Sequence, residues 1–138
     1  MVEAFQYTTS THDLVIKGHL TQTVMADKER IHEVLINLII NAIKYSPNAD
    51  KVIIKLVEKE TEIIISVRDF GFGITKEEQK KVFERFFRVK DKTDNKIEGL
   101  GLGLYLVNEI IKQHKGKLWV KSDYGEGSTF SFSLPVKK

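Results

Sequence analysis

The hydrophobic positions of the chain follow two periods, and each period predicts one kind of element. A helical period begins after Asp27, a good capping residue, and continues to about Tyr45, where Ser46-Pro47-Asn48 ends it. β-Branched residues alternate at 51–58 and 61–69, which predicts two strands joined by a tight turn. The same reasoning predicts a short helix at 2–8, a hairpin of strands at 13–20 and 22–26, a helix at 75–83, a helix from the glycines at 99–103 to His114 with Gly116 at its C-terminal cap, and a final hairpin of strands at 117–123 and 128–135.

These elements predict one α+β domain over residues 1–138. We expect a two-layer α/β sandwich, in which several helices cover one face of a mixed, mostly antiparallel sheet. Residues 88–98 lose apolar periodicity and are rich in Lys, Asp, Asn and Thr, which is typical of a mobile surface loop. This loop is the candidate lid, and we expect weak density for residues 91–97 in a crystal without ligand.

Composition narrows the function. The chain has 138 residues, 41% of them hydrophobic, so it can bury a sizeable core. It has no cysteine, so a metal would need oxygen or imidazole ligands, as magnesium sites have. The net charge of +3 comes from lysines interspersed with glutamates, which argues against a nucleic-acid surface. No apolar run reaches membrane length, so we expect this fragment to lie in the reducing cytosol without direct membrane contact.

A polar stripe runs along the predicted helix after Asp27. At about 100° per residue, Glu33, Asn37, Asn41 and Lys44 fall on one face, while the opposite face is apolar. Buried asparagines need hydrogen-bond partners, which neighbouring loops or solvent can supply. Two amide oxygens and an ammonium group on adjacent turns also suit magnesium and a triphosphate.

Glycines gather at three places. Asp69-x-Gly71-x-Gly73 follows a strand, where the backbone can approach a flat ligand and the carboxylate can accept hydrogen bonds, for example from an adenine amino group. The glycines at 99–103 begin a helix, whose free amides favour phosphate. Each of these two motifs is also compatible with a simple turn. The glycines at 125 and 127 fit a hairpin turn better than a ligand site.

In order, these motifs resemble the catalytic domain of histidine kinases, within the wider family that includes gyrase and mismatch-repair ATPases. The resemblance covers residues 24–135 and includes one box of asparagines, one of phenylalanines and three of glycines. These boxes lie at residues 30–46, 69–74, 83–88, 99–104 and 125–130. Leu100 departs from the pattern, since the family often has a threonine there, and Phe87 replaces a frequent tyrosine.

The resemblance implies an ATP site with magnesium. It implies that Asn41 binds the metal, that Asn37 lies near metal and phosphate, and that Asp69 reads adenine. The residues that we expect to bind ATP are Asn37, Asn41, Lys44, Tyr45, Asp69, Gly71, Gly73, Ile74, Phe86, Gly99, Leu100, Gly101, Leu102, Gly103, Leu104 and Thr129, with Thr129 near adenine. Those expected to act in phosphoryl transfer are Asn37, Asn41, Lys44, Arg85 and Arg88.

The implied activity is transfer of the γ-phosphoryl group of ATP to a histidine on a separate, dimeric helical domain of a two-component sensor kinase. A response regulator would then receive the group. The histidines of this chain, His12, His19, His32 and His114, do not fit the acceptor. We therefore expect an isolated, monomeric, cytoplasmic fragment that is incomplete as an enzyme, with a parent protein that can be membrane-anchored.

Two alternatives stay open. A gyrase-type clamp hydrolyses ATP with an acidic base one turn before the metal asparagine, but that position holds Asn37, and Glu33 lies a further turn away. A pseudokinase or interaction module would bind nucleotide without transferring phosphate, and Leu100 is the residue that favours it.

Overall fold

The sheet and its helices follow the predicted architecture. The computed structural model describes residues 12–90 and 102–136. The predicted helix at 2–8, the loop over 91–98 with its expected weak density, and the site candidates Gly99, Leu100 and Gly101 lie outside the described residues. In chain order the described elements are β1 (Asp13–Lys17), α2 (Lys28–Lys44), β2 (Lys51–Glu58), β3 (Glu62–Arg68), α3 (Lys76–Gln79), α4 (Gly103–Gln113), β4 (Lys117–Asp123) and β5 (Gly127–Pro135).

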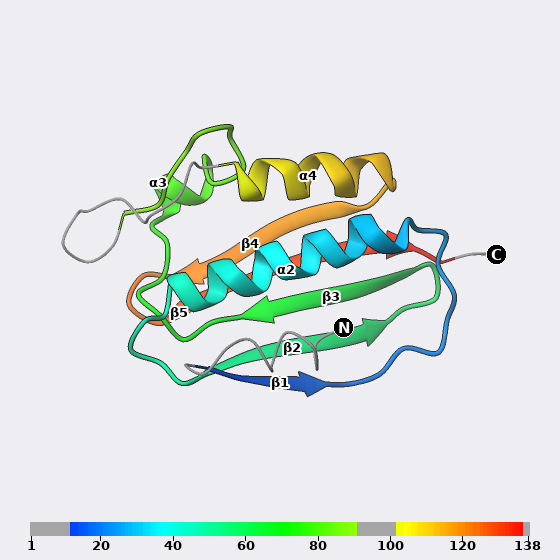
Figure 1. The fold of residues 1–138 in the computed structure, drawn as a ribbon, viewed down its shortest axis with the longest axis horizontal. Coiled ribbons are helices and arrows are strands. Elements are labelled where there is room, and N and C mark those ends of the chain that lie inside the picture. The colour runs from blue at the N-terminus through cyan, green and yellow to red at the C-terminus, as the bar shows by residue number, and fades with distance from the viewer. Residues whose placement is uncertain (1–11, 91–101, 137–138) are drawn as a thin grey trace.

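The five strands form one mixed sheet in the order β1-β2-β3-β5-β4. β1 pairs with β2 in parallel, and the other three pairs are antiparallel. Helices α2 and α4 cover the same face of this sheet (Figure 1). The predicted two-layer α+β sandwich is therefore confirmed. Within the described residues, no helix is both long and apolar enough to cross a membrane.

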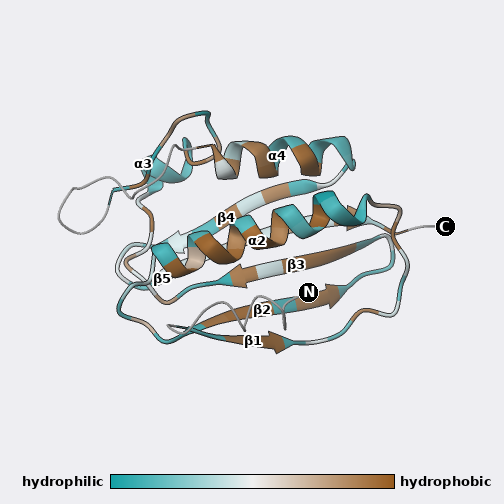
Figure 2. Cartoon of the chain, in the orientation of Figure 1, coloured by the Kyte–Doolittle hydropathy of each residue, from teal (hydrophilic) through white to brown (hydrophobic). Residues whose placement is uncertain are grey.

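The core lies between α2, α4 and the covered face of the sheet. α2 buries Val34, Leu38, Ile39 and Ala42, which share one side of the helix. Along β2, β3 and β5, buried apolar residues occupy every second position, because alternate side chains of a strand point to opposite faces. Strands β2 and β3 are mostly hydrophobic, whereas α2 alternates between hydrophobic and hydrophilic turns (Figure 2). The polar face of α2 is therefore not needed for the core and is available for a site.

The predicted hairpin at 13–20 and 22–26 is wrong. The first run forms β1, but it pairs in parallel with β2, with Val15 opposite Ile53. Gly18, at φ 89°, ends the strand, and Val24 makes only an isolated bridge to Val136. Alternating hydrophobicity identified extended chain correctly, but it carries no information on which strand is the partner.

Helix α3 is shorter than the predicted 75–83. Thr75 caps it, and its Oγ1 accepts the Glu78 N–H at 3.2 Å. After Gln79 the backbone continues as successive turns, in which Glu84 N–H donates to the Lys81 carbonyl at 2.9 Å. These turns bury Val82 in the core. Tertiary packing has here replaced a regular helix whose spacing the sequence favoured.

The C-terminus of α4 is closed by Lys115 and Gly116 together. Lys115 adopts φ 60°, and its N–H donates to the Lys112 carbonyl at 2.9 Å. The Gly116 N–H reaches the Ile111 carbonyl at 2.9 Å, which completes a Schellman motif. The predicted cap at Gly116 is therefore present, but the left-handed residue is Lys115. Glycine is needed at 116 because a Cβ there would lie 2.0 Å from the Ser133 carbonyl oxygen.

Candidate functional site

The polar stripe of α2 faces the beginning of α4. Asn37 and Asn41 are half-buried, and Lys44 is exposed at the end of the helix. The Asn37 Nδ2 donates to the Glu33 carbonyl at 2.9 Å, which fixes the side-chain amide. A Cβ added to Gly103 would lie 3.0 Å from the Asn37 Oδ1. Glycine at 103 therefore brings the α4 backbone close to the asparagine face of α2.

The N-terminus of α4 is suited to an anion. The helix has eleven residues, its capping residue Leu102 makes no side-chain cap hydrogen bond, and its first turn carries no acidic side chain. The first amides of a helix lack intrahelical partners and form the positive end of its dipole. Leu104, in the same turn, is buried in the core and so supports the helix from below. Phosphate oxygens would complete this helix start.

Asp69 supplies a buried carboxylate at the end of β3. Its side chain is 1% exposed, and its Oδ1 accepts the N–H groups of Gly71 at 3.0 Å and Ser128 at 3.2 Å. Its Oδ2 is buried and has no hydrogen-bond partner among the described residues. A buried carboxylate oxygen is costly unless a donor reaches it. The arrangement therefore leaves one strong acceptor for a ligand that carries an N–H group.

Burial has the largest effect on the pKa of the Asp69 carboxyl. Desolvation raises the pKa of Asp69 from 3.8 to about 6, and the amides of Gly71 and Ser128 and the charge of Arg68 oppose this rise only in part. A donor that hydrogen-bonds the charged form would lower the pKa again. Binding of such a donor is therefore coupled to loss of a proton near pH 6.

The glycine loop after Asp69 is held against the end of α2. A Cβ on Gly71 would lie 1.7 Å from the Tyr45 carbonyl oxygen, so only glycine allows this approach. Gly73 has φ 77° and packs against the backbone of β4, and the Ile74 N–H donates to the Ser122 Oγ at 2.8 Å. The loop is thus fixed at both ends by backbone contacts that side chains would block.

Tyr45 lies in the core. Its ring packs against Phe72, with centroids 5.9 Å apart, and against Phe130 at 6.4 Å. Burial raises the pKa of the Tyr45 hydroxyl well above its usual range, and the carboxylates of Asp69 and Glu78 raise it further. The hydroxyl therefore stays protonated and can only take part as a neutral group. This position supports the glycine loop, whereas the contact of Tyr45 with ATP remains a prediction.

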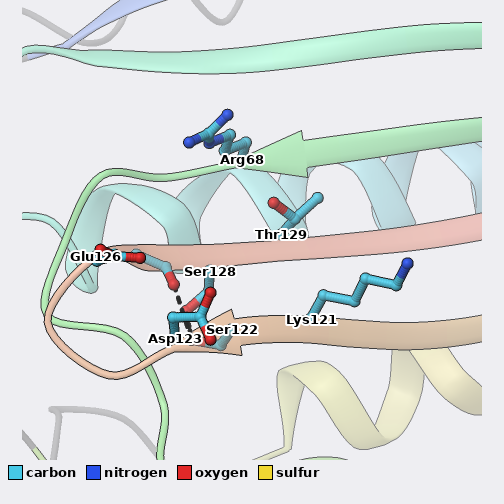
Figure 3. Close-up of a pocket in the computed structure, with 8 residues that line it drawn as sticks. Arg68, Lys121, Ser122, Asp123, Glu126, Ser128 and Thr129 are labelled. Atoms are coloured by element: carbon cyan, nitrogen blue, oxygen red, sulfur yellow. Dashed lines mark hydrogen bonds between the residues drawn. The ribbon is translucent and has the colours of Figure 1, made fainter.

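Thr129 and Ser128 lie on opposite faces of β5. Thr129 is the cross-strand neighbour of Arg68 and of Lys121, and these three residues line a recess of about 160 Å³ on the face of the sheet away from the helices (Figure 3). The buried Ser128, one residue earlier, lies at Asp69 instead. The structure does not bring Thr129 to Asp69; the backbone N–H of Ser128 contacts this carboxylate instead, and the predicted contact of Thr129 with adenine remains a prediction.

The phenylalanine box, residues 83–88, contacts α4 through the side chain of Arg85. Its Nη2 donates to the Tyr105 hydroxyl at 3.4 Å, and its guanidinium lies 5.1 Å from the centre of that ring. Tyr105 belongs to the first two turns of α4, so Arg85 is held near the same helix start as Asn37. Phe86 points outward, 63% exposed, and adopts φ 67°, which is unusual for a residue other than glycine. Arg88 is half-buried.

Three residues with roles at this site were not predicted. Ser128 bonds Asp69, Ser122 joins the glycine loop to the β4–β5 turn, and Tyr105 holds Arg85. The alternation of β5 contained the signal for the first, because Phe130, Phe132 and Leu134 must share the core face with position 128. The roles of Ser122 and Tyr105 depend on contacts between distant segments.

Two of the four histidines have structural hydrogen bonds. His12 is buried, and its Nε2 lies 2.8 Å from the Ser46 carbonyl oxygen. The Nε2 of His114 accepts the Asp27 N–H at 3.0 Å, which leaves Nδ1 to donate to the Ile110 carbonyl at 2.8 Å. His114 thus connects the start of α2 to the end of α4. His32 is half-buried on α2, and His19 is exposed in the segment after β1.

The family comparison agrees with this geometry. Residues 26–138 match the model of the family described as histidine kinase-, DNA gyrase B-, and HSP90-like ATPases. The chain therefore belongs to this family of ATPase domains. Its curated relatives include sensor histidine kinases. It is 45% identical over 115 residues to the adaptive-response sensory kinase SasA of Rippkaea orientalis, covering 83% of this chain and 29% of the relative.

A second relative also matches over only part of its own length. The chain is 38% identical over 142 residues to the sensor histidine kinase WalK of Bacillus subtilis, covering 100% of this chain and 23% of WalK. The chain therefore spans about a quarter of the length of these relatives. Their remaining parts have no counterpart here.

Solved structures share the fold. The mycobacterial sensor histidine kinase MprB matches with a TM-score of 0.82 and 27% identity, covering 99% of this chain and 89% of that chain. The nucleotide-free catalytic domain of histidine kinase ThkA matches with a TM-score of 0.76 and 31% identity, covering 97% and 85%. Full-length ShkA, solved in complex with AMPPNP, matches with a TM-score of 0.74 and 26% identity, covering 91% of this chain and 26% of that chain.

Proposed function

We propose that this domain binds Mg-ATP and donates the γ-phosphoryl group to a histidine on a separate dimerisation domain of a sensor kinase. The group would then pass to a response regulator. The relatives are multidomain sensor kinases of which this chain covers one part, which supports an acceptor outside the chain. The chain would therefore act in the cytoplasm as the catalytic half of the enzyme.

The observation that carries the proposal is the unpartnered Oδ2 of Asp69. The exocyclic amino group of adenine is a donor that would satisfy it, and the glycines at 71 and 73 let the loop after Asp69 pack closely against Tyr45 and the end of β4. Adenine would bind here for a defined energetic reason. Without nucleotide the domain keeps a buried, unsatisfied acceptor, and the amino group of adenine would satisfy it. A nucleotide without an amino group at this position would leave that cost in place.

The phosphates would lie between the stripe of α2 and the start of α4. The Asn37 Oδ1 already lies next to the backbone of Gly103, and amide oxygens suit a hard cation such as magnesium. Asn37 and Asn41 would hold the metal, which when bound neutralises phosphate charge. The amides of α4, with Lys44 and Arg85, would orient the triphosphate and stabilise negative charge on the transferred group.

Transfer is favoured over hydrolysis at this site. A neutral imidazole is already a nucleophile and needs no base to deprotonate it. The chain therefore only needs to position the phosphoryl group for transfer. The residue one turn before Asn41 is Asn37, which cannot accept a proton from water. Glu33 is ion-paired with Arg30 at 3.3 Å. A clamp-type ATPase would need one of these residues as a base.

The test combines binding and transfer. Calorimetric titration with an ATP analogue and magnesium should give a saturable site, and Asn41→Ala should abolish the magnesium dependence of the affinity. Mixing the chain with ATP and a separately produced dimerisation domain should then yield phosphohistidine. Binding of ATP without any phosphohistidine would reject the kinase activity. A steady release of phosphate that Glu33→Gln removes would favour the hydrolysing clamp instead.

A further inference from the structure

We propose that the free edge of β4 is a docking site for an extended acidic segment of a partner protein, which would join the sheet as a sixth strand. This site is separate from the nucleotide site. It uses the outer edge of the sheet and the groove beneath α3. The proposal does not depend on whether the domain transfers phosphate.

The backbone of β4 shows which groups are available. β4 is the last strand in the sheet order, with β5 on its other side. The Gln79 Nε2 donates to the Ser122 carbonyl at 3.1 Å, so this carbonyl points away from β5. Because alternate residues of a strand direct their N–H and C=O groups to the same side, Leu118 and Val120 also present theirs outward. Gln79 covers the end of the edge, and within the described part of the chain no other residue hydrogen-bonds the outer side of residues 117–121.

A groove of about 520 Å³ lies at the open part of this edge. Its apolar lining comes from Phe83, Leu118, Trp119 and Val120, and Lys76 and Lys80 form part of its border. In strand addition, main-chain hydrogen bonds give affinity and such pockets select alternate side chains. The groove can hold one large apolar side chain of an added strand.

Charge selects an acidic occupant. Lys76 begins α3 and Lys80 follows its last residue, and both are exposed, as are Lys117 and Lys121 on β4. None of these four lysines forms an ion pair within the part of the chain that the structure describes. Residues that flank a groove-bound apolar residue of the added strand point to the face of Lys117 and Lys121, so carboxylates at these positions would meet positive charge.

A second copy of the chain fits less well. The antiparallel self-pairing that uses only residues 117–121 is centred on Trp119. This register places Lys117 opposite Lys121 twice, and like charges directly opposite one another destabilise a sheet. A strand with glutamate at these positions would remove the repulsion.

The experiment uses an eight-residue fluorescent peptide in which glutamates alternate with valines and leucines. Fluorescence anisotropy should show saturable binding to the chain, and amide resonances of residues 117–121 should shift on titration. A copy of the peptide with lysine for glutamate, and a copy with methylated backbone amides, should each bind at least about tenfold more weakly. The second copy isolates the main-chain hydrogen bonds, because its side chains are unchanged.

Charge-reversal variants test the location. Lys117→Glu combined with Lys121→Glu should weaken peptide binding about tenfold, because these two lysines share the face to which the glutamates of the peptide point. The matched control, Lys28→Glu with Lys59→Glu, makes the same change in net charge at two exposed residues elsewhere and should have no effect. Equal loss in both variants, equal binding of the methylated peptide, or resonance shifts outside β4 and α3 would each overturn the proposal. Concentration-dependent dimerisation that the peptide does not displace would assign the edge to a second copy.

Discussion

At the scale of single residues, Asp69 connects binding to folding. Burial disfavours its charge, yet the proposed ligand requires that charge as an acceptor. The folded domain therefore holds a carboxylate whose charge is less stable than in water until a donor arrives. This conflict between stability and function is typical of a site residue.

The pH dependence of stability should reveal this conflict. The folded pKa of Asp69 is about 6 and its ordinary value is 3.8, so between these values the folded state binds more protons than the unfolded state. The contribution of Asp69 to the free energy of unfolding is therefore present at low pH and lost as the pH rises through 6. Relative to Asp69→Asn, the unmodified chain should gain about 2–3 kcal/mol between pH 7 and pH 4. Urea unfolding of both proteins at each pH measures this change.

Nucleotide affinity should show the opposite trend. The protonated carboxyl is a poor acceptor, so the affinity for ATP should fall as the pH decreases below about 6. In Asp69→Asn the affinity should be about 10–100-fold weaker at pH 7.5 and nearly independent of pH between 5 and 7.5. Calorimetry with an ATP analogue at constant magnesium checks both statements. An unchanged affinity in the variant would remove Asp69 from the site.

Ser128 and Thr129 offer a matched pair of substitutions. Ser128→Val removes a buried hydroxyl that lies 3.0 Å from the Ser122 Oγ, and it should lower the free energy of unfolding by about 1–2 kcal/mol and weaken ATP binding. Thr129→Val changes a half-buried residue on the other face and should shift stability by less than about 0.5 kcal/mol. Denaturation and ATP titration of the two variants compare them directly. A larger loss of affinity in Thr129→Val would restore the position first expected.

At the scale of elements, capping residues, turn residues and hydrophobic periodicity predict most helix and strand boundaries. The other boundaries depend on tertiary contacts. Helix α2 begins after Asp27 as predicted, because the Asp27 Oδ1 accepts two N–H groups of the first turn. The two hairpins at β2–β3 and β4–β5 followed from turn residues between alternating runs. The partner of β1 and the early end of α3 depend on contacts with distant segments, which period and propensity do not encode.

The end of α4 allows a test of backbone geometry. Gly116→Ala would place a Cβ 2.0 Å from the Ser133 carbonyl oxygen and should lower the free energy of unfolding by more than about 2 kcal/mol. Lys115→Gly relieves a left-handed conformation at φ 60° and should raise it by about 1 kcal/mol. Thermal unfolding of both variants should shift the midpoints in opposite directions. Equal shifts would contradict the assignment of Lys115 as the left-handed residue.

At the scale of the whole molecule, the site is assembled from four separate segments. Its asparagines come from α2, its carboxylate from the end of β3, its arginine from the turns after α3, and its free amides from α4. The order of the motifs was enough to predict the family and the fold, whereas the roles of the site residues remain predictions. Ser128 and Thr129 show the limit of a sequence motif, because these two neighbours in sequence point to opposite faces of the sheet and only Ser128 contacts Asp69.

The exposed Phe86 should matter only when the partner domain is present. Its 63% exposure and its left-handed backbone indicate a side chain held outward for a contact. The motif predicts that Phe86 binds ATP, but its outward position favours a contact with the partner domain instead. Phe86→Ala should therefore leave the free energy of unfolding unchanged and ATP affinity within about twofold, yet reduce phosphohistidine formation on an added dimerisation domain at least about tenfold. The matched control is Tyr124→Ala, an exposed aromatic in the β4–β5 turn, which should leave transfer unchanged. Loss of ATP binding in Phe86→Ala would instead place the ring at the nucleotide.

The position of β5 in the sheet affects how the protein can be synthesised. This strand comes last in the chain but lies between β3 and β4. During translation, β1, β2 and β3 emerge early, and β3 must keep an unpaired edge until residues 129–135 leave the ribosome. A chain that stops before residue 127 would expose this edge permanently, because no other strand can replace β5. We therefore expect nascent chains of this domain to depend on protection from aggregation until β5 has been synthesised.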